Sequence, residues 1–182
     1  MKDSLRLWWV ATSLTGLAGV AGPAAWAQGH AHVHGQAQLE VVLDGAELQI
    51  TLSAPLDSLV GFEHAPRTAA QRQTAEAALR SLVDPAQLFS LPPAAGCTLQ
   101  DKSVDAPTLQ AAPGAAKSGE HADLDATWRF GCSAPAQLDR VKLSLFERFA
   151  PMKRLTVLVA GPAGQGRYPL RRGAAAEVPL KR

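Results

Sequence analysis

Three histidines alternate along a short stretch near the amino end of the chain, at His30, His32 and His34. In an extended chain alternate side chains project to the same side, so the three imidazoles can face one ion. Imidazole suits zinc, copper and nickel, and zinc usually takes four ligands in a tetrahedron. We therefore predict that these histidines bind Zn²⁺. The alternative is a polar terminus whose histidines serve no common purpose.

The other two histidines stand near carboxylates. Glu63 directly precedes His64, and Asp123 follows His121 by two residues. A carboxylate can complete a zinc shell, or it can orient an imidazole through a hydrogen bond. Spacing alone makes these weak signals, because such pairs are common on protein surfaces. We expect His64 to be the first ligand from the folded domain, with Glu63, His121 and Asp123 as second-rank candidates.

The amino-terminal segment has the pattern of a secretory signal peptide. A basic start is followed by an apolar stretch from Leu7 to Val20 and by the small-residue pattern Ala25-Trp26-Ala27. The stretch is shorter than the ~20 residues that span a bilayer, and Pro23 interrupts it. We therefore predict a signal peptide over residues 1–27 rather than an uncleaved anchor, and a mature protein that is soluble in the periplasm.

Cleavage after Ala27 creates a second metal hypothesis at the new terminus, Gln28-Gly29-His30. A free amine, two backbone amide nitrogens and the imidazole can wrap Cu²⁺ or Ni²⁺ in the square-planar geometry that these ions favour. This hypothesis requires that Gln28 has not cyclised, since cyclisation removes the amine. Copper or nickel handling is thus the alternative to zinc.

Two cysteines, Cys97 and Cys132, occur in a chain expected in an oxidising compartment. A disulfide between them is the natural interpretation, and it would stabilise the fold by roughly 3–4 kcal/mol in the chain-entropy model. The rival interpretation makes them metal thiolates, although metal sites usually bring cysteines in close pairs.

Apolar patterning predicts an α+β domain over residues 36–182, rich in antiparallel strands. Alternation on both sides of Asp44-Gly45 predicts a β-hairpin, and capping-box spacing of Thr68 and Gln71 predicts one main helix that ends near Asp84-Pro85. Residues 28–35 should form a flexible, His-rich segment, and residues 105–121 a long surface loop. Further strands are expected around 97–104, 124–132, 141–145, 155–159 and 168–170.

Charge and motifs exclude several classes of protein. The formal net charge is only +2, whereas a nucleic-acid-binding protein needs a clustered basic surface. The chain has no HExxH motif, and its serines lack a nucleophile-elbow context. We expect no nucleic-acid partner and no enzymatic activity. A non-enzymatic envelope interaction module with incidental histidines stays open as another alternative.

Several stretches resemble the ZrgA-type periplasmic proteins of bacterial zinc uptake. The most specific is Gly61-Phe62-Glu63-His64-Ala65-Pro66, within a similar run over residues 53–66. The others are the histidine run at 30–35, Glu120-His121-Ala122-Asp123-Leu124, the positions Trp128, Phe130 and Cys132, and Leu145-Phe146-Glu147-Arg148-Phe149. The resemblance implies a zinc-binding periplasmic component that works with an inner-membrane transporter.

The chain departs from this family in its central loop. Related proteins tend to carry a long His/Asp/Glu tract there, but residues 110–121 hold a single histidine, His121. Bulk collection of zinc by this loop is therefore not expected. The amino-terminal histidines, with His64 and His121, would have to carry the ion.

Overall fold

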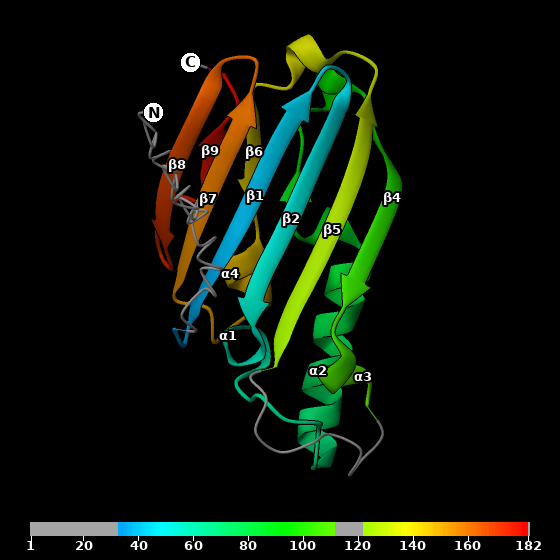
Figure 1. The fold of residues 1–182 in the computed structure, drawn as a ribbon, viewed down its shortest axis with the longest axis vertical. Coiled ribbons are helices and arrows are strands. Elements are labelled where there is room, and N and C mark those ends of the chain that lie inside the picture. Colours follow the sequence, from blue (N-terminus) through cyan, green and yellow to red (C-terminus); the bar gives the residue numbers. More distant parts are fainter. Residues whose placement is uncertain (1–32, 112–121, 182) are drawn as a thin grey trace, which may run out of the picture. The chain divides into compact units, whose positions relative to one another are not determined.

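A six-stranded sheet in the order β4-β5-β2-β1-β7-β8 forms the main layer of the fold (Figure 1). The computed structural model describes residues 33–111 and 122–181. The strands of this sheet are β1 Gln36–Asp44, β2 Glu47–Pro55, β4 Cys97–Asp105, β5 Asp123–Cys132, β7 Arg154–Gly161 and β8 Gly164–Arg171. A smaller sheet, β3-β6-β9, is made of Phe89–Ser90, Arg140–Leu143 and Glu177–Pro179.

Helices are few and short, apart from α2 Ala69–Val83. The other α-helices are α1 Leu56–Val60, α3 Pro107–Gln110 and α4 Leu145–Arg148, and 3₁₀ turns occupy Pro85–Gln87, Pro93–Ala95 and Pro135–Gln137. The predicted α+β class, with one main helix and a β-rich domain, is confirmed. No helix in the described ranges has the length and apolar character needed to cross a membrane.

The predicted hairpin is present, but its turn lies one residue later than expected. Asp44 pairs with Glu47, so the two turn residues are Gly45 and Ala46 rather than Asp44 and Gly45. Gly45 takes a φ of +55°, and both favoured two-residue hairpin turns require a positive φ at that first central position. The shift keeps Leu43 and Leu48 opposite each other on the buried face.

The predicted capping box begins α2. The Thr68 hydroxyl accepts the Gln71 N–H at 3.2 Å, and the Gln71 side-chain oxygen accepts the Thr68 N–H at 3.2 Å. The helix ends at Val83, just before Asp84 and the 3₁₀ turn that starts at Pro85. Its carboxyl end contacts the sheet directly, since the buried Trp128 indole donates a hydrogen bond to the Leu82 carbonyl at 2.8 Å.

One face of the main sheet holds the core. Alternate residues such as Leu39, Ile50, Leu52 and Trp128 point to this face and are 0% exposed, as the period of two in a strand requires. In Figure 1, α2 lies behind β4 and β5, β6 is seen behind β1 and β7, and β9 behind β7 and β8. The opposite face carries mostly polar side chains.

The sheet is not wholly antiparallel. β1 pairs with β7 in parallel, with Leu39 opposite Val157. Parallel neighbours need a long connection, and the chain between β1 and β7 contains all the elements from β2 to α4. Part of the predicted loop at 105–121 is helical, as α3, and residues 112–121 lie outside the described part of the chain.

Cys97 and Cys132 form a disulfide, as predicted. They stand directly opposite each other where β4 begins and β5 ends. Because both sulfurs are bonded to each other, neither supplies a thiolate to a metal ion.

Candidate metal centre

The β1–β2 hairpin brings His34 and Asp57 together. Gln38 pairs with Ser53 near the open end of the hairpin. His34 and Asp57 lie four residues from this pair, just beyond the ends of β1 and β2. His34 lies in a turn closed by a hydrogen bond from the Gln36 N–H to the Val33 carbonyl at 3.0 Å. Gly35 has a φ of +74° in that turn, a conformation that favours glycine. The hairpin register and this turn therefore set the position of the imidazole.

Helix α1 presents the first carboxylate. It starts directly after β2, and its buried Leu56 and Leu59 belong to the hydrophobic core. Asp57, in the first turn of the helix, lines the pocket with His34. The Leu56 N–H donates to the Ala122 carbonyl at 2.9 Å, which ties the helix to the start of β5. The Asp57 Oδ1 accepts the Ser58 hydroxyl at 3.3 Å, so the carboxylate is oriented from its own helix.

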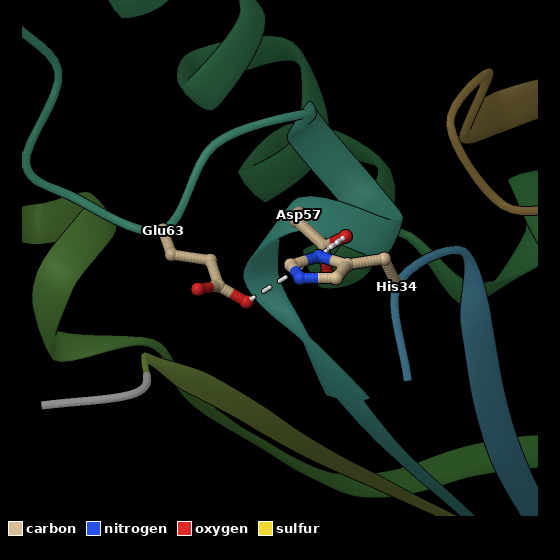
Figure 2. Close-up of side chains that lie close together, drawn as sticks. All are labelled: His34, Asp57 and Glu63. Atoms are coloured by element: carbon tan, nitrogen blue, oxygen red, sulfur yellow. Dashed lines mark hydrogen bonds and ion pairs between the residues drawn. The ribbon is translucent and has the colours of Figure 1, made fainter. Parts of the chain in front are cut away.

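The end of α1 presents the second carboxylate. Gly61 ends the helix with a φ of +85°, and its N–H donates to the Asp57 carbonyl at 2.9 Å. This left-handed residue turns the chain so that Glu63, two residues later, returns to the side where Asp57 lies (Figure 2).

The three side chains converge on one another. The His34 Nδ1 lies 2.5 Å from Asp57 Oδ2 and 4.0 Å from Glu63 Oε1. Figure 2 shows the imidazole lying between the two carboxylates. They line an open pocket of about 530 Å³, here called the His34 pocket. Its lining residues are His34, Gly35, Asp57, Gly61, Phe62, Glu63, Pro151 and Lys153.

Burial differs sharply among the three. The side chain of His34 is 78% exposed, whereas Asp57 and Glu63 are 14% and 27% exposed. The hydrogen bond to Asp57 raises the pKa of His34 above its ordinary value of 6.5, and the negative charges of Asp57 and Glu63 raise this pKa further. The apo site therefore holds a proton on His34 more tightly than a free imidazole does.

The donor set fits a divalent metal ion. One ligand atom from each of His34, Asp57 and Glu63 lies within 4.8 Å of the others, the one such group of three or more His, Cys, Asp or Glu side chains among the described residues. Zinc bonds of ~2.0–2.1 Å in a tetrahedron place ligand atoms roughly 3.3 Å apart. The His34–Asp57 contact would need to lengthen by less than an ångström and the His34–Glu63 contact to shorten by a similar amount.

The structure brings together two of the predicted ligands, His34 and Glu63. Asp57 was missed, although the signal was available, because the predicted hairpin with its strands continued to their ends puts residue 57 near residue 34. The carboxylate ligands predicted from the sequence all lie within two residues of a histidine, whereas Asp57 has no histidine near it in the sequence. Its partner is near in space only.

Of the remaining predicted ligands, the structure describes His64 and Asp123, and neither belongs to this group. His64 is half-buried in the same loop as Glu63, with its Nδ1 2.9 Å from the Ala65 carbonyl oxygen and its ring stacked on Phe62 at 5.3 Å. Asp123 begins β5, opposite Pro55. His30, His32 and His121 lie outside the described residues, as does the Gln28 terminus of the copper and nickel hypothesis.

Comparison with protein families confirms the resemblance found in the sequence. The chain matches the family described as ZrgA family zinc uptake protein over residues 31–177. This match includes His34, Asp57 and Glu63, as well as both cysteines. Comparison with curated proteins gives no significant match. With most of its length matched, the chain belongs to the ZrgA family of zinc uptake proteins.

Proposed function

We propose that this protein is a periplasmic zinc-binding component of zinc acquisition that passes the ion to an inner-membrane transporter. The observation that carries the proposal is the convergence of His34, Asp57 and Glu63 in one pocket. Nitrogen and carboxylate oxygen are ordinary zinc ligands, and three of them leave a coordination position open. Membership of a zinc uptake family supports zinc as the cargo.

The exposure of the site supports transfer rather than permanent storage. Structural zinc sites are closed by four protein ligands, whereas here the His34 side chain is 78% exposed at the mouth of an open pocket. An acceptor protein can approach an ion in such a position and replace its ligands one at a time. We propose binding and release without catalysis, in keeping with a family defined by uptake.

Further ligands are proposed from the sequence. His30 and His32 precede His34 with alternate spacing, so they can approach the same ion if that segment is extended. His64 can also contribute. If its Nδ1 donates to the Ala65 carbonyl, its Nε2 carries the lone pair that a metal needs. His121 and Asp123 are proposed as weaker contributors, and the signal peptide over residues 1–27 as the route to the periplasm.

Calorimetric zinc titration of the metal-stripped mature protein tests this function. We expect one well-defined site that His34→Ala weakens by at least about tenfold, or 1.4 kcal/mol. His64→Ala, run beside it, measures whether the second histidine belongs to the site. Asp101→Asn serves as a control, because Asp101 is an exposed carboxylate that pairs with Arg129. Unchanged zinc binding by His34→Ala would refute the proposed centre.

A growth test addresses the role in uptake. A strain that lacks the protein should grow poorly when zinc is chelated, and the wild-type chain should restore growth better than the His34→Ala variant. Rescue by copper or nickel instead of zinc would favour the amino-terminal copper and nickel alternative. Equal rescue by both chains would indicate an envelope module whose histidines are incidental.

A further inference from the structure

A lysine shares the His34 pocket with the two carboxylates. Lys153 immediately precedes β7, and its backbone N–H donates to the Gly35 carbonyl at 2.8 Å. The Arg154 N–H donates to the same carbonyl at 3.0 Å. These two hydrogen bonds hold the start of β7 against the turn that carries His34.

The stem of Lys153 lies across Gly35. A Cβ atom placed on Gly35 would lie 3.2 Å from Lys153 Cδ and 3.3 Å from Lys153 Cγ. The side chain therefore runs over the residue next to His34, and Lys153 lines the pocket together with Asp57 and Glu63. Because Gly35 has no Cβ, the Lys153 side chain can cross it without a steric clash.

A protonated lysine amine has three donors and no acceptor, so it cannot ligate a cation. Its charge attracts the carboxylates of the metal-free pocket and repels a divalent ion that enters. We propose that Lys153 weakens zinc binding in the His34 pocket and speeds zinc release, so that the ion can be handed on. This inference rests on the proposed zinc site and adds the residue that sets its affinity.

The effect is separable from the structural role of the segment. The hydrogen bonds to Gly35 come from the backbone, so substitution of the Lys153 side chain retains them. Methionine has a similar unbranched stem without the charge, and arginine keeps the charge. Lys153→Met therefore removes the charge and Lys153→Arg keeps it, while both retain an unbranched stem.

The test is zinc affinity and dissociation rate of the full mature chain, with zinc chloride as the probe. Lys153→Met should bind zinc about three- to tenfold more tightly, mainly through slower dissociation, while Lys153→Arg stays near wild type. The difference should shrink in 1 M salt, where screening acts within ~3 Å. If the wild-type chain binds zinc and His34→Ala binds it more weakly, the zinc site stands. Equal or weaker binding by Lys153→Met would then overturn only the proposed role of Lys153. Absence of zinc binding by the wild-type chain would overturn the proposed function and this inference with it.

Discussion

His34 and Asp57 face each other across the open end of the β1–β2 hairpin, with Nδ1 and Oδ2 2.5 Å apart. The strand register that pairs Gln38 with Ser53 brings them together, and α1 orients the carboxylate. In the metal-free protein this contact is a hydrogen bond that a proton occupies. Zinc has to displace that proton, so the same geometry that gathers the ligands also makes binding depend on pH.

Replacement of Asp57 by asparagine should weaken zinc binding by at least about tenfold. The amide keeps the size of the side chain but removes the negative charge and one strong oxygen ligand. The pKa of His34 should also fall toward its ordinary value, because the hydrogen bond to Asp57 is the main cause of its rise. Calorimetry measures the affinity, and histidine NMR measures the pKa. The Asp101→Asn control should alter neither quantity.

Zinc affinity should decline as the pH falls, beginning above pH 6.5. The imidazole must be neutral to bind, and the pKa of His34 in the folded apo protein is raised above 6.5. Below that raised pKa, affinity should fall by up to tenfold for each pH unit. Titrations between pH 8.5 and 5.5 would show this decline, and a flat profile would contradict ligation by His34.

The contribution of His34 to the stability of the metal-free protein should depend on pH in the opposite direction to zinc affinity: it should be larger at low pH than at high pH. A pKa that is higher in the folded than in the unfolded state favours folding when the group is protonated. The contribution of His34 is therefore fully present below pH 6.5 and is lost as the pH rises through the folded-state pKa. Chemical unfolding of wild type and His34→Ala at pH 6 and pH 8.5 would isolate this difference. A larger wild-type advantage at pH 8.5 would contradict the assignment.

Gly35→Ala should lower both stability and zinc affinity. A non-glycine residue at a φ of +74° costs about 1–2 kcal/mol, and the added methyl group would press on Lys153 and on the Pro151 carbonyl. Relief of this strain would shift the adjacent His34 relative to Asp57 and Glu63, and this shift is the expected cause of the lower zinc affinity. Gly173→Ala is the matched control, since Gly173 has a φ of +86° and nothing within 4 Å of an added Cβ. Both variants should lose stability to denaturant, but zinc affinity should fall only in Gly35→Ala. A loss of affinity in both would point to a general effect of strain.

Removal of the disulfide should destabilise the fold without removing the zinc site. The Cys97→Ser, Cys132→Ser double variant should lose roughly 3–4 kcal/mol of unfolding free energy. The disulfide lies at the carboxyl end of β5, next to the start of β2. The His34 pocket lies beyond the carboxyl end of β2, at the far end of these strands. At temperatures where the variant stays folded, calorimetry should show unchanged zinc affinity. Lost affinity would revive a metal role for the cysteines.

The hairpin, the start of the main helix and the disulfide could be predicted from the sequence because each depends on a short pattern or on a single pair of residues. Alternation around Gly45, the Thr68–Gln71 capping box and two cysteines are signals within one element or between two residues, and the structure confirms each of them. The histidine run drew attention to His34 in the same way, and the family resemblance rests on short continuous stretches.

The tertiary structure decided what shares a pocket. Asp57 joins His34 because a hairpin returns the chain to its starting end, and Lys153 joins them because β7 pairs with β1 in parallel after a long connection. His64 has a carboxylate beside it in sequence, yet its Nδ1 faces the Ala65 carbonyl. Adjacency in sequence does not determine direction in space. The sequence by itself determined the main hairpin, the long helix, most strands of the large sheet and the metal-binding residue types, although Leu145, expected at the end of a strand, begins α4. Strand pairing determined which charges surround the proposed ion.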